Sequence, residues 1–158
     1  MSTETLSTET ATRSDALPVA ALRRIGGLGI LAGVVLIAAG VIVWIAITVQ
    51  LSAEQIIVSD DAAYLAGTPV NNPVAAFAQA DIINHHALEA SGGLTYAQLE
   101  QDDPIRATVM NASFLRASLF TSVVSYGVAV FAAGMGLMLG LFGWSIRALV
   151  PSKARESA

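Results

Sequence analysis

The sequence predicts an all-α membrane protein with two transmembrane helices and a small helical extracytoplasmic domain between them. Three observations predict this fold class. First, the 158-residue chain is 54% hydrophobic and only 13% charged, whereas soluble domains carry about 25% charged residues. Second, the hydrophobic residues form two long runs without an ionisable side chain, at residues 25–51 and 117–146. Third, basic residues flank these runs on the sides that lead to the chain termini.

Each run is long enough to form a transmembrane helix, because about 20 apolar residues cross the hydrocarbon core of a bilayer. We therefore predict transmembrane helices at residues 21–51 and 117–149. Buried helices of a soluble protein are the alternative, but two uncharged runs of this length in so short a chain disfavour it. A cleaved signal peptide would have an apolar core of about 7–15 residues, so the first run is interpreted as a retained helix.

The distribution of charge predicts the orientation. Residues 52–116 contain eight acidic residues and two arginines, which gives this segment a net charge of −6. The segments outside the two runs are richer in Lys and Arg, which remain on the cytoplasmic side of a membrane. We predict a plasma-membrane protein with both termini cytoplasmic. Residues 1–20 are expected to be a disordered tail, residues 150–158 a short polar tail, and residues 52–116 the extracytoplasmic domain.

Local signals divide the segment between the two runs. Residues 56–58 predict a short extended segment. An Asn at the N-cap and a Pro at N1 predict a helix over residues 73–90, which Ser91-Gly92-Gly93 ends. The mostly apolar face of this helix is expected to comprise Val74, Phe77, Ala78, Asp81, Ile82, His85 and Leu88.

Two further signals concern the approach to the second run. A capping box that starts at Thr95 predicts a short helix through Gln101. Asp103 and Pro104 repeat the N-cap and N1 signal, and no helix breaker follows until Pro151. The second transmembrane helix is therefore expected to begin well outside the membrane.

Composition excludes several functional classes. The chain has no cysteine, which excludes disulfides, thiolate catalysis, iron–sulfur clusters and cysteine-based zinc sites. Its net charge of −4 disfavours nucleic acid as a partner. Neither run contains a histidine for haem ligation or an acid or base that would mark an ion path. We expect a protein that is not an enzyme and carries no cofactor.

The weak candidate metal ligands lie on the helix over residues 73–90. Asp81, His85 and Glu89 follow one another at four-residue spacing and share one helix face, whereas His86 points away. A metal site on this face is one interpretation, although the residues do not match the H-E-x-x-H signature. The other interpretation is a polar helix face, or a pH-sensitive contact to a partner, because histidine titrates near neutral pH.

Small residues predict where the helices pack. Gly29 and Gly33 form a G-x-x-x-G motif in the first run, and Ala132, Gly136 and Gly140 follow one another at four-residue spacing in the second. Small residues allow helix backbones to approach closely. The contacts are expected within the helical hairpin, with the helices of a partner, or both.

Three other residues are predicted to lie at the membrane interface. Trp44 and Trp144 have the amphipathic rings that are enriched at headgroup level. Arg116 can extend its guanidinium to the phosphates of the headgroups.

Four segments of the sequence resemble a family of small actinobacterial membrane proteins with two transmembrane helices. The segments read DDAAYLAG, FAQADII, HALEASGG and NASFLRASLF and begin at residues 60, 77, 86 and 111. Members of this family are often described as aromatic ring-opening dioxygenase subunits. Such iron enzymes need a set of histidine and carboxylate ligands, which this sequence does not convincingly offer. The chain is also similar to accessory subunits of the mycobacterial and corynebacterial cytochrome bcc–cytochrome c oxidase supercomplex.

These observations give three functional hypotheses. The first is a non-catalytic accessory subunit or assembly factor of a multi-subunit membrane complex, where it would contact integral membrane subunits and lipids. The resemblance implies that this complex is the respiratory supercomplex of the electron transport chain, with cytochrome bcc or cytochrome c oxidase subunits as partners. The second is a metal-binding envelope protein or enzyme that uses Asp81, His85 and Glu89. The third is a homo-oligomer that organises the envelope.

Overall fold

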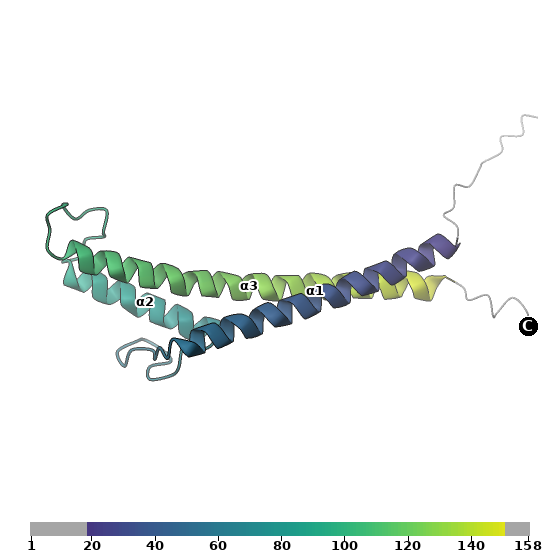
Figure 1. Cartoon of the computed structure of the whole chain (residues 1–158), viewed down its shortest axis with the longest axis horizontal. Coiled ribbons are helices and arrows are strands. Elements are labelled where there is room, and N and C mark those ends of the chain that lie inside the picture. The colour runs from purple at the N-terminus through teal and green to yellow at the C-terminus, as the bar shows by residue number, and fades with distance from the viewer. Residues whose placement is uncertain (1–18, 151–158) are drawn as a thin grey trace, which may run out of the picture.

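A computed structural model describes residues 19–150 of the chain. This part contains three helices, α1 (Val19–Ala53), α2 (Pro73–Ala90) and α3 (Arg106–Leu149). In Figure 1, α1 runs beside the C-terminal half of α3, and α2 lies beside its N-terminal half. The all-helical fold expected from the sequence is confirmed for the described residues. The predicted tails fall mainly on residues 1–18 and 151–158, which lie outside them.

The α1 helix begins and ends close to the predicted bounds. It includes residues 19 and 20, which were assigned to the tail, and it extends two residues beyond the predicted end at residue 51. Differences of one or two residues are common at helix ends. Gln55, just after the helix, has a positive φ of 52°, a backbone conformation that interrupts helical hydrogen bonding. The chain then leaves the helix axis and enters the loop that leads to α2.

The loop between α1 and α2 folds back on itself as a narrow hairpin. Ile57 and Pro69 form an isolated antiparallel β-bridge, so the extended segment predicted at residues 56–58 is present without a regular sheet. The backbone N–H of Val58 donates to the carbonyl of Thr68, and that of Val70 donates to the carbonyl of Ile56. Val58 and Val70 are almost completely buried and belong to the core beneath the loop.

The start of α2 confirms the capping prediction. Asn72 is the N-cap in extended conformation, Pro73 is the first helical residue, and Ser91 is the C-cap. The side-chain oxygen of Asn72 accepts hydrogen bonds from the backbone N–H groups of Val74 and Ala75, at 3.1 and 3.0 Å. Gly92 and Gly93 follow the helix with positive φ, as a helix-terminating pair requires.

Asn72→Ala is expected to lower the free energy of unfolding by about 1 kcal/mol, because two N–H groups at the helix start lose their acceptor. Asn72→Ser is the control, since serine is an equally good N-cap. Thermal unfolding of the detergent-solubilised protein, followed by circular dichroism, measures the difference. Equal losses in the two variants would show that the cap does not contribute.

The apolar face predicted for α2 is only partly buried, at Ala78 and Ile82. Val74 and Phe77 are exposed, and so are Asp81 and His85. Most of the buried positions are alanines, whose small side chains allow close packing, but Gln79 and Ile82 are buried as well. The buried residues of α2 are Ala75, Ala76, Ala78, Gln79, Ala80 and Ile82.

The α3 helix is continuous over 44 residues, or about 66 Å, as the absence of a breaker predicted. The helix starts at Arg106, slightly later than the predicted N-cap at Asp103 and N1 at Pro104. The Asp103 carboxylate accepts a hydrogen bond from the backbone N–H of Ile105 at 2.9 Å.

The prediction of a short helix from Thr95 to Gln101 is wrong. The Gln98 side chain does accept from the Thr95 N–H, but the segment forms only turns, because so short a helix gains too few hydrogen bonds to offset nucleation.

Both long helices are apolar and poorly buried. In the most apolar 18-residue stretch of each helix, only 11% is buried in α1 and 17% in α3. A helix in the core of a soluble protein would be mostly buried instead. α1 and α3 are therefore long and apolar enough to cross a membrane, and their outward surfaces are apolar.

Candidate interaction surfaces

The contact between α1 and α3 depends on glycines spaced by seven residues. Gly26, Gly33 and Gly40 are the buried residues in the apolar part of α1 before its last turn. A Cβ placed on Gly33 would lie 2.5 Å from the carbonyl oxygen of Gly136, and a Cβ on Gly136 would lie 2.6 Å from that of Gly33. Such distances are shorter than any real Cβ contact, so the two backbones are in direct contact at this level.

The same contact repeats one heptad away in each direction. A Cβ on Gly143 would lie 2.5 Å from the carbonyl oxygen of Gly26, and a Cβ on Gly40 would lie 2.6 Å from that of Ala129. A seven-residue repeat keeps the contacting residues on one side of both helices. Close backbone approach maximises van der Waals contact where apolar surroundings provide no hydrophobic force.

The residues predicted to pack lie in or beside this contact. Gly33 and Gly136 face each other directly, and a Cβ on Gly29 would lie 3.4 Å from the Cα of Gly143. Gly140 lies opposite Gly33, although a Cβ of its own would point into open space. Ala132 is half-buried. The sequence prediction followed four-residue spacing, with Gly134 and Gly143 noted only as nearby small residues. It missed Gly26, Gly40 and Ala129, which the seven-residue spacing would have found.

Three other glycines do not take part. A Cβ on Gly27, Gly127 or Gly134 would meet nothing within 4 Å. Gly127 and Gly134 are exposed on α3. Substitutions at Gly127 and Gly134 are matched controls for substitutions at the packed glycines, because the same residue type is replaced where no neighbouring atom is close.

Tyr126 connects α1, α3 and the loop before α2. Its side chain is 1% exposed, and its hydroxyl lies 2.8 Å from the Thr48 hydroxyl and donates to the Asn71 carbonyl at 3.3 Å. Trp44 packs edge-on against its ring with centroids 4.6 Å apart. Tyr126 thereby attaches the outer loop to the helical hairpin, a role that its sequence context did not indicate.

The residues predicted at the membrane interface have different surroundings. Trp44 is partly covered by Tyr126, whereas Trp144 is 64% exposed. The Arg116 guanidinium lies 5.3 Å from the centroid of the Phe120 ring, which in turn packs edge-on against Phe77 of α2. Phe120, rather than Arg116, makes the contact between α3 and α2.

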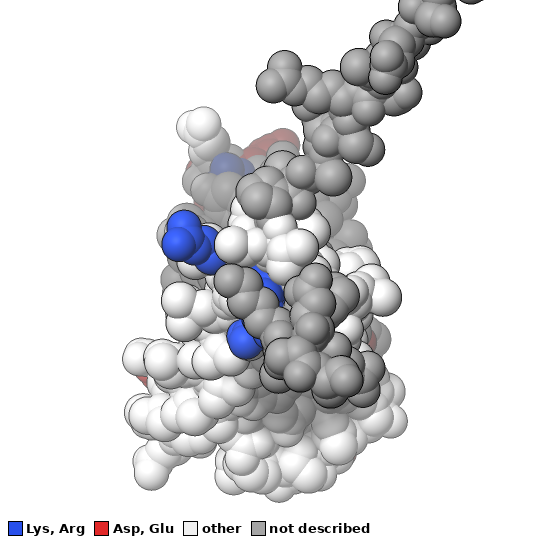
Figure 2. Space-filling model, turned by 90° about the vertical axis from the view of Figure 1, so that its right-hand side faces the viewer, with Lys and Arg blue, Asp and Glu red and all other residues white. Residues whose placement is uncertain are grey.

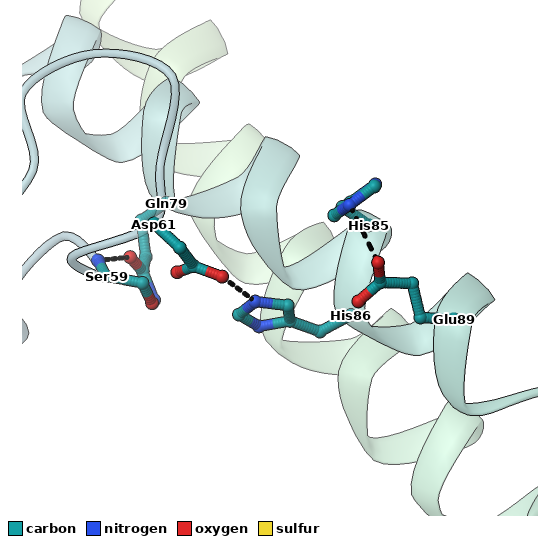
Figure 3. Close-up of polar contacts among 6 residues, drawn as sticks. All are labelled: Ser59, Asp61, Gln79, His85, His86 and Glu89. Atoms are coloured by element: carbon teal, nitrogen blue, oxygen red, sulfur yellow. Dashed lines mark hydrogen bonds and ion pairs between the residues drawn. The ribbon is translucent and has the colours of Figure 1, made fainter.

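The candidate metal ligands do not converge. His85 pairs with Glu89 at 3.1 Å, and no bond joins either of them to Asp81 among residues 19–150. In that part of the chain, no group of three or more His, Asp or Glu residues is arranged to hold a metal ion. Figure 3 shows the His85 ring beside Glu89, while the neighbouring His86 points in another direction.

His86 binds the loop instead. Its Nε2 lies 2.6 Å from a carboxylate oxygen of Asp61, as Figure 3 shows. This hydrogen bond lowers the pKa of Asp61 below its ordinary value, because it favours the charged carboxylate. In the same loop, the Ser59 N–H donates to Gln79 of α2 at 2.9 Å. The two bonds join the hairpin loop to α2, and neither could be predicted from residues so far apart in sequence.

The lowered pKa of Asp61 predicts how the loop responds to acid. Stabilisation by this carboxylate is complete above the ordinary aspartate pKa of about 4 and is lost as the pH falls through the lowered value. We expect the Gly67 amide, which donates to the Val58 carbonyl, to exchange faster below that pH after correction for the intrinsic rate. Asp61→Asn should remove this pH dependence, and its persistence in the variant would contradict the assignment.

Charge is distributed unevenly along the molecule. Figure 2 views it from the end where α1 begins and α3 ends, and basic side chains are visible there. The arginines of these helix ends are Arg23, Arg24 and Arg147. The acidic residues of the described part lie in the segment from residue 54 to residue 103, toward the opposite end of the molecule.

Comparisons with known proteins add no relative. No protein-family model, no curated protein and no solved structure matches the chain.

Proposed function

We propose that the protein is a two-span membrane protein that acts as a non-catalytic accessory subunit or assembly factor of a multi-subunit membrane complex. The exposed apolar surfaces of α1 and α3 support the membrane assignment, since water would not tolerate apolar area of this extent. The direct backbone contact between α1 and α3 supports a retained hairpin rather than a cleaved leader.

The arrangement of charged and aromatic residues suggests where the bilayer lies. Arg24 and Arg147 end the apolar surface on one side, and Trp44 and Tyr126 lie about 20 residues further along their helices, or about 30 Å. This length equals the thickness of a hydrocarbon core. Positive residues favour the cytoplasm, so both termini would be cytoplasmic and α2 extracytoplasmic.

This placement extends α3 beyond the membrane. It shortens the second span from the predicted residues 117–149 to about residues 126–147, so Arg116 would lie outside the bilayer rather than at its interface. Residues 106–125 would project about 30 Å from the bilayer, with α2 packed against them. Several large apolar side chains of this projecting part are exposed, which is unfavourable in water and typical of a surface that contacts another protein. They are Val74, Phe77, Phe114, Leu115 and Val124. The exposure of these apolar side chains is the single observation that carries the proposal of a partner.

The resemblance to accessory subunits of the actinobacterial respiratory supercomplex selects the first partner to test. Affinity purification of the tagged full chain from native membranes in mild detergent should recover cytochrome bcc or cytochrome c oxidase subunits. Recovery of a different set of membrane subunits would retain the accessory role and exclude this complex. Cross-links between copies of the chain alone would favour a homo-oligomer and overturn the proposal.

Phe114→Ser is expected to reduce the yield of co-purified partner several-fold, because this side chain is 64% exposed on the projecting part of α3 and aromatic residues dominate interface energies. Asn111→Ala, an exposed change one turn earlier on the same helix, is the control. Quantitative mass spectrometry of the purified complex measures both. Equal yields from the two variants would mean that this surface does not contact the partner.

A further inference from the structure

A half-open cavity of about 330 Å³ lies between the hairpin loop and α2. Its volume is near the lower end of the range for ligand sites, about 300–1,000 Å³, and suits a single side chain. The polar residues that line it come from both segments. They are Asp61 and Tyr64 of the loop and Asp81, Asn84 and His85 of α2. Ile82 and Leu88 provide an apolar part of the wall.

The cavity is negatively charged, and the described chain offers little to neutralise it. Asp61 is bonded to His86, but Asp81 forms no ion pair or side-chain hydrogen bond within residues 19–150. The two arginines of the outer half are engaged elsewhere. Arg106 donates to the Leu99 carbonyl and lies 4.3 Å from the centroid of the Tyr96 ring, and Arg116 lies against Phe120.

We propose that this cavity binds an arginine side chain from the extracytoplasmic part of the partner. The inference rests on the proposed function, because it assigns one contact of the accessory subunit with its complex. A guanidinium group presents five N–H donors in a plane, which suits carboxylate and amide oxygens on separate walls. It also stacks on aromatic rings such as that of Tyr64, while its aliphatic stem packs on apolar side chains such as Ile82 and Leu88.

Lysine matches the cavity less well. Its ammonium group is a compact, strongly hydrated charge that lacks the planar donor array and the stacking surface. A lysine probe is therefore expected to bind more weakly than an arginine probe of the same charge.

The cavity can be tested on the full chain in nanodiscs of zwitterionic lipid. The probe is N-acetyl-arginine amide, and its neutral analogue N-acetyl-citrulline amide is the control. NMR signals of the His85 ring, which lines the cavity, report binding. The exposed Trp144 ring, near the other end of α3, is the internal reference. We expect a saturable shift with the arginine probe and about two- to fivefold weaker binding of the citrulline probe, the range for exposed ion pairs.

Two variants that each remove one negative charge distinguish binding in the cavity from nonspecific attraction of the probe to the acidic segment between α1 and α3. Asp81→Asn removes a carboxylate from the wall and should weaken the arginine probe about two- to fivefold. Glu100→Gln removes a carboxylate that does not line the cavity and should leave binding unchanged. Equal effects of the two variants, or equal binding of arginine and citrulline, would overturn the proposal.

A steric variant links the cavity to the partner. Ala63→Phe places a ring at an exposed position of the lining, where folding should tolerate it, and it should reduce both probe binding and partner yield. If the wild-type chain recovers its partner but Ala63→Phe and Asp81→Asn recover it equally well, the cavity assignment fails and the accessory function stands. If the wild-type chain recovers no partner, the accessory function itself fails.

Discussion

Replacing Gly33 by leucine is expected to lower the free energy of unfolding of the hairpin by about 3 kcal/mol or more, the upper range for overpacking. A Cβ at this position would lie 2.5 Å from the Gly136 carbonyl oxygen and 2.8 Å from the Gly140 nitrogen. Both atoms belong to backbone, so no flexible side chain can move aside. The helices would have to separate and lose the close contacts on either side as well.

Titration of the purified protein with SDS in mixed micelles, followed by tryptophan fluorescence, measures this loss. Trp44 is a suitable probe, because it packs against Tyr126 across the α1–α3 interface. Gly134→Leu is the matched control, since a side chain there meets nothing within 4 Å, and its effect should stay within about 0.5 kcal/mol. Similar losses for Gly33→Leu and Gly134→Leu would mean that the helices do not pack through the seven-residue glycine repeat.

Tyr126→Ala is expected to cost about 3–5 kcal/mol, the range for removing a buried aromatic side chain. The change leaves a cavity beside Trp44 and removes the hydroxyl that bonds Thr48 and the Asn71 carbonyl. Tyr126→Phe retains the ring and should cost only about 1–2 kcal/mol, through the lost hydrogen bonds. The two variants therefore separate packing from hydrogen bonding.

A double-mutant cycle identifies the hydroxyl pair. Thr48→Val and Tyr126→Phe should show an interaction energy of at least about 0.5 kcal/mol, because residues in one hydrogen-bond network are not additive. The control cycle combines Thr48→Val with Tyr96→Phe, a tyrosine outside this hydrogen-bond network whose ring lies against Arg106. The effects of these two changes should be additive. Strict additivity of the first pair would contradict a direct bond between the two hydroxyls.

The sequence predicts those parts of the fold that depend on local signals. The α2 bounds followed from Asn72 and Pro73, whose backbone requirements act within one turn, and the length of α3 followed from the absence of a breaker. The apolar face expected for α2 is only partly the buried one, since Ala78 and Ile82 are buried whereas Val74 and Phe77 are exposed. Close packing favoured alanine there and left Phe77 exposed.

The candidate surfaces were less predictable, because they depend on which segments meet. The glycine contact could have been found from the spacing of residues 26, 33 and 40, had a seven-residue period been sought. The bond between Asp61 and His86 has no local signal, since 25 residues separate the two. The same holds for Tyr126, whose partners belong to α1 and to the loop before α2.

The continuity of α3 has a mechanical consequence. Because one unbroken helix forms both the second span of the proposed placement and the outer projection, the two parts act as a lever that turns about the bilayer surface. A change of about 10° in the tilt of the span would move the outer tip by about 5 Å, for an arm of about 30 Å. Transmembrane helices adopt tilts over a range of about 0–40°. A partner that binds the outer tip would thus favour one tilt of the span. Conversely, a change in bilayer thickness would displace the tip.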